Sequence, residues 1–91
     1  MNMHSMTLEQ LRATHETGGL AAATLKAEGK DFYIVADSRS GGRVVLVRYS
    51  DRKPRPFAEP GTALKLLREI GFGSVKVDMA AWQPDQKQVA E

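Results

Sequence analysis

Apolar and polar positions recur with two different periods along this chain, and the changes between them predict two helices and four strands. The clearest helix spans residues 60–70, where apolar residues recur at spacings of three and four between Ala63 and Ile70. Pro60 suits a first helical turn because its missing N–H has no carbonyl partner there, and Gly71 suits the left-handed residue that closes a helix. The pattern therefore predicts an amphipathic helix that must pack on a sheet.

A second, shorter helix is predicted over residues 7–17. Thr7 and Gln10 have the spacing of a capping box, in which each side chain bonds the backbone N–H of the other residue. The glycines at 18 and 19 end the helix. A helix of this length is marginal alone, so we expect it to dock on the rest of the domain.

Four runs read as strands, because they are rich in β-branched and aromatic residues or alternate between turn signals. The alanines of the first run would also suit a helix, but its place between a glycine pair and the turn-like residues 28–31 favours a strand. The predicted strands are residues 20–27, 32–37, 43–49 and 74–80.

The third predicted strand, residues 43–49, is apolar on both faces, which is typical of a strand covered on both sides. The second cover would be either the helix at 7–17 or another copy of the chain, and the latter predicts a homodimer. A single helix between two strands of one sheet makes those strands parallel, so the last strand is expected beside the third or the first.

These elements predict an α+β fold with the order α-β-β-β-α-β and a four-stranded, mostly antiparallel sheet, with the second helix packed on one face. A chain of 91 residues allows one domain. We place a flexible start at residues 1–6, the single domain at 7–82 and a flexible polar tail at 83–91.

The composition excludes several classes of function but does not identify one. The chain has no cysteine, which excludes disulfides, thiolate nucleophiles and cysteine-ligated metals. No apolar run approaches the length of a membrane span, and the first residues lack the pattern of a signal peptide, so we expect a cytoplasmic protein with no membrane partner.

The charged residues are distributed unevenly along the chain. Six basic residues and one acidic residue lie between positions 39 and 56, a local charge of +5 in a chain of net charge +2. Such a set is either a solvated strand edge that resists pairing or a surface for phosphates, with Tyr33 and Tyr49 as stacking faces. The candidate nucleic-acid-binding residues are Arg39, Arg43, Arg48, Arg52, Lys53 and Arg55.

No catalytic, cofactor or metal site is predicted, and no small-molecule substrate is evident. His15 lies on the apolar side of a short helix, where a packed histidine is the ordinary case, and the acidic residues are scattered singly. The glycine pairs are explained by helix ends and turns and lack the context of a phosphate loop.

The overall pattern resembles the small ParC-like, partition-associated proteins of plasmids and integrative elements of proteobacteria. The segments that carry this resemblance are TLEQLR (7–12), GG (18–19), RPF (55–57), ALKLLREIG (63–71) and DMAAW (78–82). The resemblance implies a non-enzymatic accessory of DNA segregation or mobile-element maintenance, and it brings no known binding residues with it.

The expected function is thus a mobile-element partition or maintenance accessory that binds a partition protein or DNA. The alternative is a nucleic-acid-binding module that uses the basic edge at 39–56, and a small enzyme is the third class. Salt separates the first two, because phosphate contacts weaken steeply with salt whereas an apolar protein interface does not.

Overall fold

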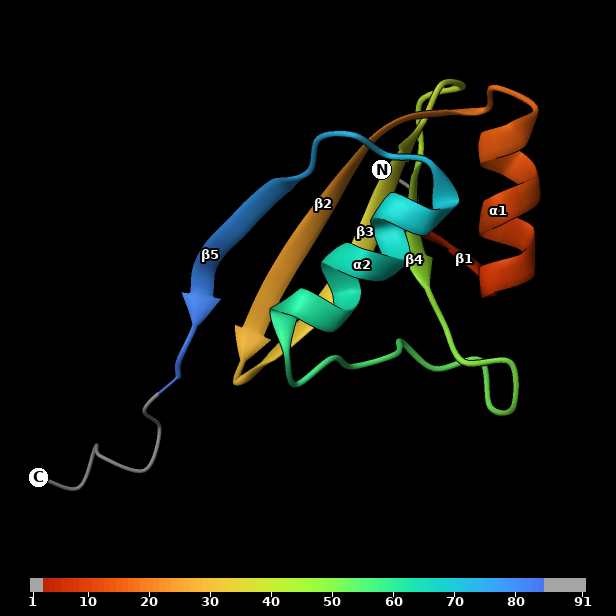
Figure 1. The fold of residues 1–91 in the computed structure, drawn as a ribbon. Helices are drawn as coiled ribbons and strands as arrows, with labels where there is room; N and C mark the ends of the chain where they lie inside the picture. Colours follow the sequence, from red (N-terminus) through yellow and green to blue (C-terminus); the bar gives the residue numbers. More distant parts are fainter. Residues whose placement is uncertain (1–2, 85–91) are drawn as a thin grey trace, which may run out of the picture.

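The fold is a mixed α+β sheet with two helices, in a computed structural model that describes residues 3–84 (Figure 1). The elements follow one another as β1 (Met3–Met6), α1 (Leu8–Glu16), β2 (Leu20–Gly29), β3 (Asp31–Ser38), β4 (Arg43–Leu46), α2 (Pro60–Ile70) and β5 (Lys76–Trp82). The α+β class, both helices and all four predicted strands are confirmed. Of the predicted tail, residues 85–91 lie outside the described residues.

The sheet has five strands in the order β1-β4-β3-β2-β5. The pairs β2·β3 and β3·β4 are antiparallel, whereas β1·β4 and β2·β5 are parallel. The prediction of four mostly antiparallel strands is therefore wrong in strand number and in the balance of directions. The last strand does run parallel to the third, and of the two positions left open it takes the one beside the first predicted strand.

β1 is the strand that the sequence does not predict, and residues 3–6 are not part of a flexible start. Its four residues pair in parallel with β4, from Met3 opposite Arg43 to Met6 opposite Leu46. The Val47 N–H also donates to the Met6 carbonyl over 2.9 Å. The segment has no alternating pattern because backbone pairing with the free edge of β4, rather than a buried face of its own, holds it.

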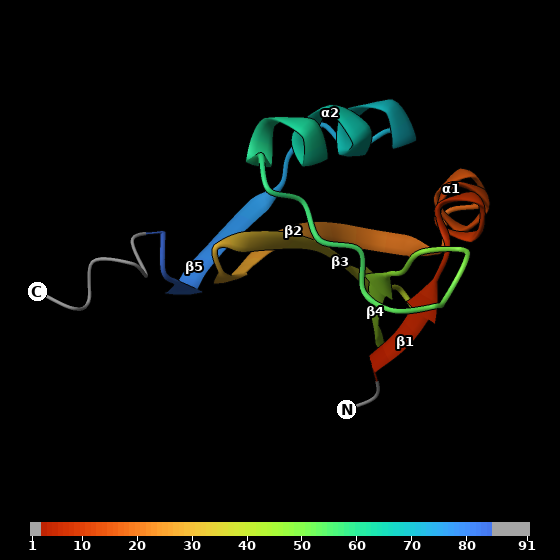
Figure 2. The same ribbon diagram turned by 90° about the horizontal axis from the view of Figure 1, so that it is seen from below.

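α2 begins and ends where its sequence predicts. Pro60 occupies the first turn, and Gly71 takes a positive φ of 131° while its N–H donates to the Leu67 carbonyl. Ala63, Leu67 and Ile70 are buried against β2 and β3. Figure 2 shows α2 lying across one face of the sheet.

α1 has the predicted capping box, in which Thr7 and Gln10 bond each other's backbone N–H groups. Its buried Leu11 joins the same core as α2. The His15 ring meets Phe72 edge-on, with 4.7 Å between the ring centres, so His15 is a packed histidine at the contact between the two helices. α1 therefore lies on the α2 face (Figure 2) and does not supply the predicted cover for the second face of β4.

β4 is shorter than predicted, because the chain turns away after Val47. A bridge joins Val47 to Pro54, and the next segment returns beside β3, where Phe57 exchanges two backbone hydrogen bonds with Phe32. Val47 is buried by this returning segment and Val45 is half-buried. Part of the second cover thus comes from a connecting segment, which neither predicted alternative includes.

Candidate nucleic-acid interface

The two helices leave the opposite face of the sheet open, and the candidate site lies there. Alternation along β3 places Phe32, Ile34 and Ala36 in the core under the helices, so Tyr33 and Val35 point to the open face. Register then places Lys26 opposite Tyr33 on the neighbouring strand. Side chains that share a face and a register position contact each other.

A groove of about 550 Å³ runs over this open face. It joins residues of β2, β3 and β4 to the segment that returns after β4, so its walls come from parts of the chain that are distant in sequence. The groove is lined by Lys26, Glu28, Tyr33, Val35, Val45, Arg48, Lys53, Pro54 and Pro56.

The groove has an apolar floor and charged sides. Val35 is only 3% exposed, and the half-buried Val45 is its register partner on β4. Pro54 and Pro56 continue this apolar surface along the returning segment. The cations come from two places in the chain, namely Lys26 on β2 and the turn after β4, which carries Arg48 and Lys53. An aromatic ring bordered by cations over an apolar floor is the composition that single-stranded nucleic acids bind.

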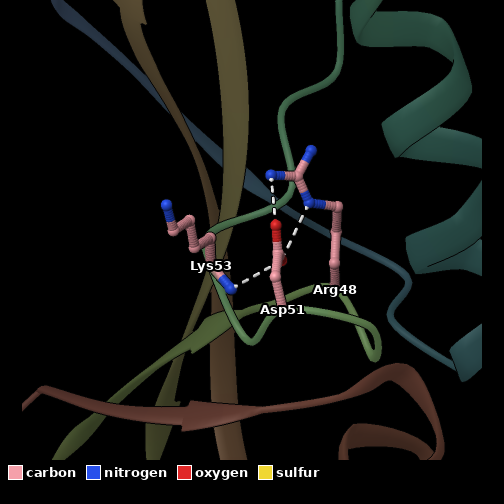
Figure 3. Close-up of polar contacts among 3 residues, drawn as sticks. All are labelled: Arg48, Asp51 and Lys53. Carbon is pink, nitrogen blue, oxygen red and sulfur yellow. Dashed lines mark hydrogen bonds and ion pairs between the residues drawn. The ribbon is translucent and has the colours of Figure 1, made fainter.

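The turn after β4 holds Arg48 and Lys53 at the groove (Figure 3). The Asp51 carboxylate accepts from the Arg48 Nε and Nη2 atoms over 3.2 and 3.0 Å and from the Lys53 backbone N–H over 3.0 Å. Two backbone bonds close the turn, from the Arg48 N–H to the Lys53 carbonyl and from the Arg52 N–H to the Arg48 carbonyl. Arg52 takes the left-handed φ of 59° that this tight turn needs.

These contacts also fix the charge of Asp51. The hydrogen bond from the Lys53 N–H, followed by the one from the Arg48 guanidinium, lowers the pKa of Asp51 below its ordinary value of 3.8. The carboxylate is therefore ionised at neutral pH and offsets part of the Arg48 charge that faces the groove.

The six predicted basic residues do not form one surface. Arg39 and Arg43 lie at the turn between β3 and β4, whereas the other four follow β4 at its far end (Figure 1). The five residue steps from Arg43 to Arg48 span on the order of 16 Å in extended chain. Arg43 also forms an ion pair with Asp37 over 3.0 Å. The structure thus brings only Arg48 and Lys53 of the predicted set into the groove.

Two further arginines of the set lie over aromatic rings. Arg52 lies over the exposed Tyr49 ring, 5.8 Å from its centre, and Arg55 lies over Phe57 at 4.8 Å. These contacts direct the two guanidinium groups along the protein surface. Tyr49 is accordingly a partner of Arg52 and is not part of the groove lining.

The sequence reasoning misses Lys26 and the two prolines as site residues. Lys26 lies outside the basic run, and only the β2·β3 register brings it beside Tyr33. Pro54 and Pro56 predict a connection between elements, and their sequence gives no sign that this connection lines the open face. Tyr33 had the right residue type, but its position in the site also depends on strand register.

The described residues offer little for catalysis or metal binding. No group of three histidine, aspartate or glutamate side chains gathers in residues 3–84 in a way that could hold a metal ion. A second hollow of about 590 Å³ lies between β1, α1 and the β3–β4 turn, and it includes His4, Ser5, Ser38 and Ser40. The two turn serines bond each other over 2.8 Å, and no acid accompanies His4 in the lining.

Comparison of the chain with models of known protein families gives no match, and comparisons with curated proteins and with solved structures give no significant match either. Among the residues that the structure describes, no helix has the length and apolar character needed to cross a membrane.

Proposed function

We propose that the protein is a non-enzymatic accessory of a mobile genetic element that binds a single-stranded segment of nucleic acid on the open face of its sheet. One observation supports this most directly: Tyr33 lies in a groove with three cations from two separate segments, Lys26 on β2 and Arg48 and Lys53 in the turn after β4. The setting of partition or maintenance comes from the sequence resemblance, which implies work on DNA segregation.

Single-stranded nucleic acid suits the groove better than a duplex. An unpaired base can stack on the Tyr33 ring, and sugars and neighbouring bases can contact Val35, Val45 and the prolines. The backbone phosphates then reach Lys26 and Lys53 at the sides. A duplex presents phosphates but keeps its base faces stacked inside, so it would leave the aromatic ring and the apolar floor unused.

The apolar floor would also suit a peptide of a partition protein, which is the second form of the proposed function. Salt distinguishes the two ligands. Neutralised phosphates make the logarithm of the binding constant fall linearly with the logarithm of the salt concentration, by about 0.7 per phosphate for a single strand. A peptide held by apolar contacts shows little such dependence.

Fluorescence anisotropy with a labelled single-stranded oligonucleotide tests the proposal. We expect Tyr33→Ala to weaken binding by about 5- to 150-fold, because stacking of one base contributes about 1–3 kcal/mol. The double variant Lys26→Ala with Lys53→Ala should lower the salt slope by about 1.4, which corresponds to two lost phosphate contacts.

A matched control removes two charges from the other face. Lys65 and Arg68 are exposed on α2, so Lys65→Ala with Arg68→Ala changes the net charge equally without touching the groove. If the two double variants lose affinity equally, the loss reflects net charge alone, and the proposed site is contradicted. An affinity that changes neither with salt concentration nor with Tyr33→Ala would contradict nucleic-acid recognition.

A further inference from the structure

β5 carries an unusual amount of exposed apolar surface. Three of the five exposed large hydrophobic residues of the described chain lie on this strand of seven residues, namely Val77 at 44%, Met79 at 55% and Trp82 at 39% exposure. The sequence predicts Val75, Val77 and Met79 as inward-facing. Only Val75 packs against the core, so the prediction of burial is wrong for the other two.

Strand register explains why these side chains remain exposed. Val77 is the partner of Leu25 and Trp82 the partner of Gly29, so both lie on the helix-covered face of the sheet. The Trp82 ring leans on Phe32 with 5.7 Å between ring centres. α2, however, packs over β2 and β3 and does not extend over β5 (Figure 2). The helix face of β5 is thus an apolar strip that no helix of residues 3–84 covers.

β5 also ends the sheet. It is last in the strand order, and in residues 3–84 no strand pairs with its outer edge. Segment 76–82 contains no proline, and its two charged residues, Lys76 and Asp78, have opposite signs, so they can attract each other in a pair of copies. Between Asp78 and Ala81 the pairing with β2 is irregular, because two residues of β5 lie opposite one residue of β2. The regular part of the β5 edge is therefore its first part, residues 76–78.

We propose that this edge pairs with β5 of a second copy of the chain, antiparallel and about a two-fold axis at Val77. In this register Lys76 of each copy lies opposite Asp78 of the other, which forms two cross-strand ion pairs. Asp78 uses its Oδ1 atom to accept from the Ala80 N–H over 3.1 Å, and its other oxygen can accept from the lysine. The charges of the strand are thus self-complementary.

The neighbouring registers lack this complementarity. An axis at position 76 places Lys76 opposite itself, and an axis at 78 places Asp78 opposite itself, so both juxtapose like charges. An axis at 79 pairs both charged residues with uncharged ones and centres the contact on the irregular part of the strand. Only the axis at 77 matches the charges and also uses the regular residues.

The same register covers the apolar strip. The two Val77 side chains meet on the axis, and Val75 of one copy faces Met79 of the other. The axis is perpendicular to the sheet, so the helices of both copies stay on one side and both open faces lie on the other. The groove and the β5 edge share no residue, and they meet only where Asp78 is the register partner of Lys26.

A charge swap measured by sedimentation tests the register. The 10.0 kDa chain should sediment at twice its mass in the micromolar range. Lys76→Asp places like charges opposite each other at two positions and should raise the dimer dissociation constant at least about tenfold. Lys76→Asp with Asp78→Lys restores opposite pairs and should recover the dimer. A wild-type chain that stays monomeric, or a double variant no better than the single one, would overturn the proposal.

Cross-linking provides a second measurement that does not rely on the charges. The chain has no cysteine, so Val77→Cys introduces a single thiol, and two such thiols would meet at the axis. Cβ atoms of directly opposite residues lie about 4.5–5.5 Å apart, close to the distance that a disulfide bridges. Mild oxidation should give a covalent dimer for Val77→Cys. Ala81→Cys, equally exposed on the same strand but away from the axis, should remain monomeric, and equal cross-linking of both would contradict the register.

Discussion

Gly71 shows how one residue couples the two helices. Its φ of 131° is unfavourable for other residues, and a Cβ built there would approach the His15 ring to 2.5 Å. We therefore expect Gly71→Ala to lower the free energy of unfolding by about 1–3 kcal/mol, through backbone strain and displacement of His15 from Phe72. Urea denaturation followed by circular dichroism measures this loss.

Gly73 is the matched control for that substitution. It lies two residues further on, has no positive φ, and a Cβ there meets no atom within 4 Å. Gly73→Ala should leave stability unchanged within about 0.5 kcal/mol. Similar losses in both variants would mean that the Gly71 conformation and its contact with His15 contribute nothing particular.

Asp51 is the residue that regulates the charge of the groove. Asp51→Asn keeps an oxygen that can accept from the Lys53 N–H but removes the negative charge beside Arg48. We expect tighter binding of the single-stranded oligonucleotide, by at most about fivefold, because an exposed ion pair of this kind is weak. Anisotropy at low salt measures the gain, which should disappear at high salt. A loss of affinity would show that the carboxylate matters more for holding the turn together than its removal matters for freeing the Arg48 charge.

At the scale of elements, local signals predicted the helices and most strands. Pro60 and Gly71 fix the ends of α2, and the capping box fixes the start of α1, because caps depend on neighbours in sequence. Strand ends were less accurate. β4 stops at Leu46 although its apolar run continues, because the returning segment forms backbone bonds with Leu46 and Arg48, on either side of Val47.

Features that depend on pairing between distant segments were not predictable from local pattern. β1 forms by pairing with β4, and its four residues show no alternation of apolar and polar positions. The groove likewise depends on register, which places Lys26 beside Tyr33, whereas the extended length of β4 separates Arg43 from Arg48. Of the six basic residues predicted from sequence, the structure therefore brings only Arg48 and Lys53 together in the groove.

At the scale of the whole molecule, the two proposals make a joint prediction about ligand length. A dimer through β5 presents two open faces on one side, so one long strand can enter both grooves, and the second binding event becomes intramolecular. We expect the wild-type chain to bind an oligonucleotide of about 30 nucleotides at least about 100-fold more tightly than one of about 8, a length that fills one site. Val77→Asp, which places two carboxylates on the proposed axis, should bind the short oligonucleotide normally and lose most of the gain for the long one. Anisotropy with both lengths measures the ratio of the two affinities.

An unchanged ratio in a variant shown to be monomeric by sedimentation would mean that long strands gain affinity along a single chain. Weak binding of the short oligonucleotide by wild type would instead count against the groove and leave the dimer standing.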